Sequence, residues 1–234
     1  MGFSGDNNLV PSLRNIPFLM WNSLVDELVP PTDYIPTAEK FDSLGYRYEL
    51  DVFTPSEHLT LAINDQFAPA AAFLDLVKVN RNPAHVTYVV DPTLDYPALG
   101  FVADHAYWLS GIKLRSATPP VTGGHAQGSI DALSYGFGTG DPTPSDTQFG
   151  TGTLTGGNLP TPLVFTRQFR TWGPVPSIPR LRRIDLAARN ITAVTINVRR
   201  ANVGCGVDLH VDTDGPMTIE LAGCGRTVAA GGGA

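Results

Sequence analysis

The segment "NIPFLMWNSLVDELVPPTDYIPTAEKFDSLGYRYELDVF", residues 15–53, determines the fold class that the sequence predicts. It begins with a nearly continuous apolar run, residues 15–21, which is typical of a strand covered on both faces. Residues 33–45 then place apolar side chains at helical spacing and end at a glycine, a common helix terminator. Residues 46–53 alternate and are rich in aromatic side chains, as strands are. Strand, helix and strand in this order indicate a βαβ unit with parallel strands.

From about residue 78 onward, apolar and polar residues alternate instead. The runs are short and separated by Pro, Gly and Asn turns, and they predict about eight strands of a β-sandwich. Two of these runs, on either side of Arg189 and Asn190, are interpreted as a hairpin. Residues 138–162 are poor in apolar side chains, which predicts a long, flexible, exposed loop. We therefore expect two domains: an α/β fragment in residues 1–77 and an all-β sandwich in residues 78–234.

The two cysteines, Cys205 and Cys224, flank two alternating runs that meet at Asp214 and Gly215. Because the midpoint between the cysteines falls between these two residues, a symmetric hairpin places the cysteines opposite each other, within disulfide reach. A bridge indicates an oxidising compartment, so we expect a secreted or periplasmic protein, although the N-terminus shows no secretion signal. The alternative is a pair of reduced, half-buried thiols at strand ends.

Charge, hydropathy and ligand spacing limit the partners and ions. The net charge is −6 over 234 residues, whereas general nucleic-acid binding needs a positive field. No window of about 18 consecutive apolar residues occurs, so we expect no membrane-spanning segment. The histidines and cysteines lack zinc-binding spacing. Asp212 and Asp214 have the oxygen-ligand spacing of a weak calcium candidate, but a hairpin turn explains them better. We expect no cofactor.

Asp26 and His58 are the strongest candidates for chemistry. Each follows one strand of the predicted βαβ unit, and functional groups of parallel sheets lie on loops just past the carboxyl ends of strands. Neighbouring parallel strands therefore bring the two loops together. An aspartate that accepts a hydrogen bond from one imidazole nitrogen fixes the tautomer, so the other nitrogen can take a proton from a nucleophile. Considered alone, Asp26 could equally well cap a turn, and His58 could be an ordinary loop or core histidine without a catalytic function.

Residues 10–75 resemble the carboxyl-terminal part of an α/β-hydrolase, close to the prolyl-oligopeptidase-like and dienelactone-hydrolase-like esterases and peptidases. In that family an apolar strand leads to a loop of the form D-x-x-V-P with the triad acid, which matches residues 26–30. A helix ending in Leu-Gly and a strand then lead to the triad histidine, which matches residues 44–45 and His58. The resemblance implies a partial α/β-hydrolase sheet and hydrolysis of carboxylic esters, lactones or amides, with His58 as general base and Asp26 as its orienter.

The chain departs from this family at the nucleophile. The family carries its serine in G-x-S-x-G, upstream of the acid, and no such pentapeptide occurs here. The closest segment, "GFSGD" at residues 2–6, holds Ser4 but lacks the last glycine and a preceding strand. The nucleophile is then a serine outside this chain, Ser4, or a water activated by His58. The sequence looks like the distal part of a larger hydrolase, and Met1 need not be the natural start.

An interpretation from another class stays open: a non-catalytic, secreted β-sandwich module that binds a polymer or partner and carries a hydrolase remnant. Tyr107, Trp108 and Tyr135 are interpreted as sandwich core rather than as the lining of a sugar or acyl groove. A two-stranded parallel fragment leaves the unpaired backbone groups of an edge strand exposed. We therefore expect the sandwich to cover this edge, or the edge to pair with a second copy of the chain (a homodimer) or with an upstream hydrolase fragment. As an enzyme, the protein is expected to act on a small ester or lactone.

Overall fold

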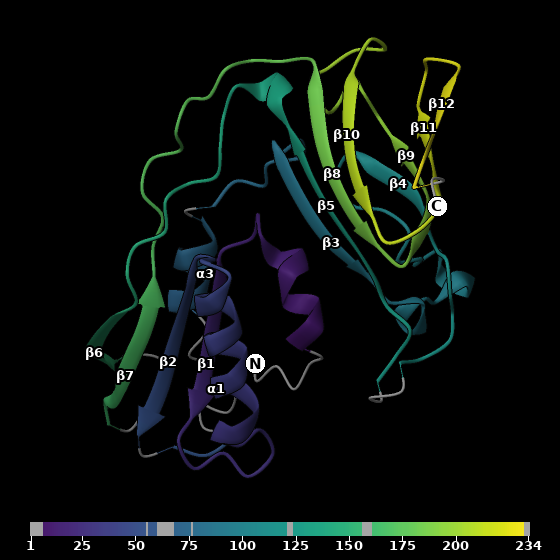
Figure 1. The fold of residues 1–234 in the computed structure, drawn as a ribbon. Helices are drawn as coiled ribbons and strands as arrows, with labels where there is room; N and C mark the ends of the chain where they lie inside the picture. Colours follow the sequence, from purple (N-terminus) through teal and green to yellow (C-terminus); the bar gives the residue numbers. More distant parts are fainter. Residues whose placement is uncertain are drawn as a thin grey trace. The chain divides into compact units, whose positions relative to one another are not determined.

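The computed structural model describes residues 7–54, 56–59, 68–75, 77–120, 124–155 and 161–231. These residues contain twelve strands in three four-stranded sheets, with few helices (Figure 1). The chain divides into two compact units. The first unit comprises residues 1–79 and 142–174, and the second unit comprises residues 80–141 and 175–234. Among the described residues, none of the helices combines the length and the hydropathy that a membrane span requires.

One mixed sheet with the strand order β1-β2-β7-β6 forms the first unit. Its described elements are η1 Asn7–Leu13, β1 Phe18–Ser23, α1 Pro31–Ser43, β2 Tyr48–Thr54, α3 Ala68–Asp75, β6 Gln148–Leu154 and β7 Leu163–Arg170. β1 and β2 are parallel, whereas β7 is antiparallel to β2 and β6 is antiparallel to β7. The predicted helix between two parallel strands is present, and it starts at Pro31.

The α/β class predicted for residues 1–77 is wrong. Half of the sheet is the antiparallel pair β6–β7, and both strands come from the part of the chain that we assigned to the sandwich. The described chain as a whole is mostly β and has no helix-rich arrangement like that of an α/β-hydrolase. A single βαβ unit does not determine which strand lies beside β2. β7 occupies that edge, which we expected to be covered by the sandwich or by a second chain.

The flexible loop predicted for residues 138–162 contains β6 and is therefore also corrected. β6 exposes most of its side chains, and Leu154 is its only buried residue. Composition missed the strand because a ladder of backbone hydrogen bonds to β7 needs few apolar side chains on the edge strand. The predicted boundary at residues 77–78 lies close to the observed division after residue 79, but residues 142–174 return to the first unit.

α1 lies along one face of the β1–β2 pair (Figure 1). Phe41 of the helix is fully buried in a cluster with Met20 of β1 and Leu50 of β2. Gly45, at φ +67°, ends the helix, because the N–H of Tyr46 then reaches the carbonyl oxygen of Phe41. This packing fixes the two loops that follow β1 and β2.

Two sheets with the orders β10-β8-β5-β3 and β12-β11-β9-β4 form the second unit. The strands are β3 His85–Val90, β4 Leu109–Leu114, β5 Gly128–Ser134, β8 Arg183–Arg189, β9 Ile191–Ile196, β10 Asp208–Thr213, β11 Met217–Leu221 and β12 Arg226–Ala230, with short 3-10 turns η2 Pro92–Leu94, η3 Pro97–Leu99 and η4 Tyr135–Phe137. Residues of both sheets share one core cluster, which includes Ile130, Ile184, Ile191 and Ile219. Trp108 is buried in this core as predicted.

The two hairpins predicted in the second unit are wrong. β8 and β9 are joined at Asn190, but β8 pairs with β5 and β10 in one sheet and β9 with β4 and β11 in the other. β10 and β11 are split in the same way, parallel to β8 and β9 respectively. Each connection is thus an arch between the sheets. In a hairpin the apolar side chains of the two strands lie on one face of the same sheet. In an arch the apolar side chains of one strand face those of the other across the core. The alternation in the sequence is the same in both cases, so it does not distinguish them.

The predicted disulfide between Cys205 and Cys224 is confirmed, with an S–S distance of 2.06 Å and a Cα–Cα distance of 5.4 Å. The reason for its formation differs from the predicted one. Cys205 precedes β10 and Cys224 follows β11, so the bridge closes the open end of the second arch and joins the two sheets.

Candidate active site

The loops that follow β1 and β2 bring Asp26 and His58 together. His58 Nδ1 lies 2.9 Å from Oδ1 and 3.0 Å from Oδ2 of Asp26. The strands are parallel, with Ser23 at the end of β1 beside Phe53 of β2, so both loops leave the same edge of the sheet. The proximity that the sequence predicted for the two side chains is therefore present.

Asp26 is held in place by its own loop. Its side chain is only 6% exposed, and Oδ1 accepts hydrogen bonds from the N–H groups of Leu28 and Val29 at 2.9 and 2.8 Å. Burial raises the pKa of Asp26, but the N–H groups of Val29 and Leu28 together with the His58 imidazole outweigh it, so the pKa lies below its ordinary value. The carboxylate is therefore ionised at neutral pH.

Two buried serines tie the Asp26 loop to the His58 loop. Ser23 Oγ donates to the carbonyl oxygen of Glu57 at 3.0 Å, and Ser56 Oγ donates to Ser23 Oγ at 2.7 Å. The hydroxyl of Tyr34 on α1 donates to the carbonyl oxygen of Ser23 at 3.5 Å. Burial, followed by the negative charge of Asp26, raises the pKa of this hydroxyl. These contacts fix the position of the His58 backbone relative to β1.

His58 presents its second ring nitrogen away from Asp26. With Nδ1–H donating to the carboxylate, the neutral imidazole carries its lone pair on Nε2. No described residue is hydrogen-bonded to Nε2, and the His58 side chain is 28% exposed. The arrangement can therefore accept a proton at Nε2 and stabilise the resulting imidazolium through Asp26.

The residues that the structure describes offer the pair no serine nucleophile. Ser4 lies outside the described residues, so the structure does not place it. The nearby hydroxyls of Ser23 and Ser56 are buried and bonded to Glu57 and to each other. Within the described ranges, no serine or cysteine is hydrogen-bonded to His58.

The weak calcium candidates Asp212 and Asp214 have structural partners instead. Asp214 accepts from Arg115 Nη1 at 2.7 Å and from the N–H of Asn190, and Asp212 accepts from Arg189 Nη2 at 2.6 Å. The two carboxylates thereby connect the turns of the two arches. The described part of the chain contains no group of three or more His, Cys, Asp or Glu side chains placed to hold a metal ion.

A second buried aspartate with a histidine partner, Asp91 and His125, was missed by the sequence analysis. Asp91 Oδ2 lies 3.1 Å from His125 Nδ1 and accepts from Gln127 Nε2 at 2.9 Å, while Oδ1 accepts from the Thr93 N–H. Burial raises the pKa of Asp91, but hydrogen bonds from Thr93, Gln127 and His125 lower it to about 2. The Asp-Pro-Thr turn at 91–93 was the only available signal, and it predicts a turn rather than a histidine partner.

The chain matches no protein-family model, no curated protein and no solved structure.

Proposed function

We propose that the chain hydrolyses carboxylic esters or lactones with Asp26 and His58 as its acid–histidine pair. The observation that supports this most is the 2.9 Å distance from His58 Nδ1 to a buried Asp26 carboxylate that its own loop holds with two N–H groups. A fixed anion behind a part-exposed imidazole keeps one tautomer and stabilises the imidazolium that forms when the other nitrogen takes a proton from the nucleophile. Both properties are needed in a general base.

In this proposal a water is the nucleophile. His58 Nε2 takes a proton from the water as its oxygen forms a bond to the carbonyl carbon, and Asp26 stabilises the imidazolium. The imidazolium then gives the proton to the leaving oxygen as the ester or lactone C–O bond breaks. Aryl esters and lactones suit this mechanism better than peptides, because their carbonyl groups are activated. A serine nucleophile, from Ser4 or from another chain, is the alternative.

Two further features support the proposal. The resemblance of residues 10–75 to the end of a hydrolase that carries the triad acid and histidine is consistent with β1, α1 and β2, which hold both residues at strand ends. The Cys205–Cys224 disulfide fits a secreted or periplasmic enzyme, since disulfides persist in oxidising compartments.

The test compares wild type with His58→Ala and Asp26→Asn on p-nitrophenyl acetate and on dihydrocoumarin, an aryl lactone. We expect His58→Ala to lower kcat/KM by about 100-fold or more, as loss of a general base does. Asp26→Asn should lower it by at least about tenfold, because the amide no longer stabilises the imidazolium. A buried ion pair without catalytic function would leave both rates unchanged.

His105→Ala is the matched control, because His105 also pairs with an aspartate, Asp104, but is 66% exposed. Any exposed imidazole reacts slowly with p-nitrophenyl acetate, and this variant measures that background. Equal rates for His58→Ala, His105→Ala and wild type would reject the enzyme. In that case the alternative, a non-catalytic secreted β-sandwich module that binds a polymer or partner and carries a hydrolase remnant, becomes the better interpretation, and the β-rich fold of the described residues supports it.

A further inference from the structure

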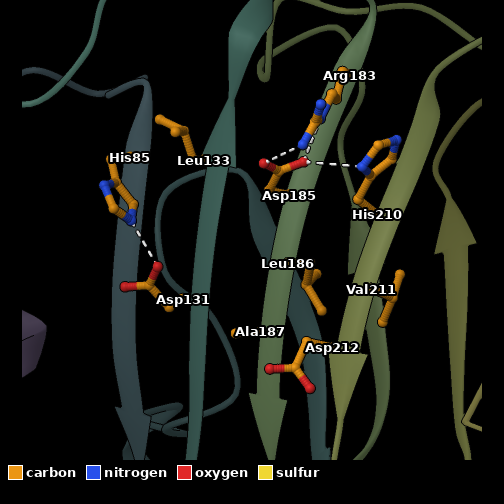
Figure 2. A pocket seen from close by; sticks show the side chains of 10 residues that line it. All are labelled: His85, Asp131, Leu133, Arg183, Asp185, Leu186, Ala187, His210, Val211 and Asp212. Atoms are coloured by element: carbon orange, nitrogen blue, oxygen red, sulfur yellow. Dashed lines mark hydrogen bonds and ion pairs between the residues drawn. The ribbon is translucent and has the colours of Figure 1, made fainter.

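The outer face of the β10-β8-β5-β3 sheet carries a groove, and two rows of its lining side chains cross the strands (Figure 2). The strand registers align the residues of the first row, which are His85, Leu133, Asp185 and His210. The registers also align the residues of the second row, which are Asp131, Ala187 and Asp212. The groove volume is about 420 Å³, within the range of roughly 300–1,000 Å³ of small-molecule sites.

The charged side chains of this groove are all paired. His85 lies between two carboxylates, with Nε2 2.7 Å from Asp131 and Nδ1 2.8 Å from Asp141. Both ring nitrogens of His85 are thus engaged by carboxylates. On the opposite side, the Arg183 guanidinium forms two hydrogen bonds to Asp185.

The remaining charged side chains of the groove are also paired. His210 lies 2.8 Å from Asp208 and 3.8 Å from Asp185, and Asp212 accepts from Arg189. A charged ligand would have to displace one member of an ion pair in order to bind the other member. An apolar ligand would remove the ion pairs from water without replacing the hydrogen bonds that they make to water. A neutral ligand with hydroxyl groups does neither, because a hydroxyl both donates and accepts.

The floor of the groove is small and apolar. Leu133 and Ala187 lie between the two charged sides (Figure 2), and the short Ala187 side chain leaves the space between Asp131 and Asp212. At one end, Tyr135 donates from its hydroxyl to Asp185, and Arg183 stacks on its ring at 5.0 Å. Tyr135 therefore belongs to this surface and not to the core, where the sequence placed it. Hydroxyl partners around an apolar floor complement the polar rim and C–H faces of a sugar ring.

We propose that this groove binds a neutral saccharide. The test is retardation of the full chain in native gels that contain hydroxyethyl cellulose, galactomannan, arabinoxylan or glycogen, with polygalacturonate and chitosan as anionic and cationic probes. At least one neutral polymer should retard the protein. Ala187→Trp fills the groove without removing an ion pair and should weaken this binding by about tenfold or more. Ala187→Leu takes its place if the tryptophan variant does not fold.

The matched control is Ala229→Trp, an exposed alanine on β12 of the other sheet, which should bind like wild type. The proposal is overturned if no neutral polymer retards the protein, if only a charged polymer does, or if Ala187→Trp binds normally. His58→Ala should leave saccharide binding unchanged, because His58 is not part of the groove. Saccharide binding and ester hydrolysis are therefore tested independently of each other.

Discussion

All five histidines of the chain contact at least one aspartate. At the scale of residues, the sequence predicted only the pair of Asp26 and His58, because both follow neighbouring parallel strands and such strands end at one edge of a sheet. The partners of His125 and His85 come from turns and strand faces, and their positions depend on sheet registers that alternation does not define. For the same reason the sequence did not show that Asp214 pairs with Arg115.

Asp91 gives a prediction about acid stability. Its pKa falls from an ordinary value of 3.8 to about 2 in the folded protein, so the folded state favours the ionised form. The stabilisation is complete above the unfolded pKa and is lost as the pH falls through the folded pKa. Between about pH 5 and about pH 2 the protein should lose about 2 kcal/mol of unfolding free energy through this group alone.

Urea unfolding of wild type and Asp91→Asn at a series of pH values checks this loss. The stability difference between the two proteins should shrink by that amount toward low pH, because the asparagine does not titrate. A constant difference for Asp91→Asn would show that the Asp91 contacts do not depend on its charge.

At the scale of elements, the sequence defined which segments are strands better than it defined how they pair. Residues 15–53 form the predicted strand, helix and parallel strand, because an apolar run, a helical period and a terminating glycine are local signals. The choice between a hairpin and an arch is not local. Ile184 and Leu186 on β8, and Val194 and Ile196 on β9, alternate equally well for both, and the arches form because the two sheets must share one core.

The pair β6–β7 gives a prediction at this scale. Gly152 lies opposite Phe165, and a Cβ at Gly152 would come within 2.2 Å of the Phe165 ring, which packs against Phe53. Gly152→Ala should therefore displace the ring and lower the unfolding free energy of the first unit by about 1 to 3 kcal/mol. Gly150 lies opposite Arg167 on the same strand and has no atom within 4 Å of an added Cβ.

Gly150→Ala is the matched control and should stay within about 1 kcal/mol of wild type, since alanine only restricts the unfolded chain there. Thermal unfolding of both variants gives the comparison. If both substitutions have the same effect, β6 does not pair with β7 in the register described.

At the scale of the whole molecule, the chain passes between its two units three times, after residues 79, 141 and 174. The sequence indicated a division near residue 78 through the change of period, but it could not show that residues 142–174 return to the first unit. Their alternating strand pattern fits either unit. What places them in the first unit is the pairing of β7 with the free edge of β2.

The disulfide gives a prediction that separates the two units. Cys205 and Cys224 are both in the second unit and are separated by 19 residues, a loop for which a bridge contributes about 3 kcal/mol. The double variant Cys205→Ser/Cys224→Ser should therefore destabilise the second unit and leave the first, with Asp26 and His58, unchanged. In calorimetry, Gly152→Ala identifies the transition of the first unit and Asp91→Asn that of the second. The cysteine variant should lower only the transition temperature of the second unit, which is the transition that Asp91→Asn shifts. If it also lowers the transition that Gly152→Ala shifts, or if the whole chain unfolds in a single transition, the two units do not unfold separately.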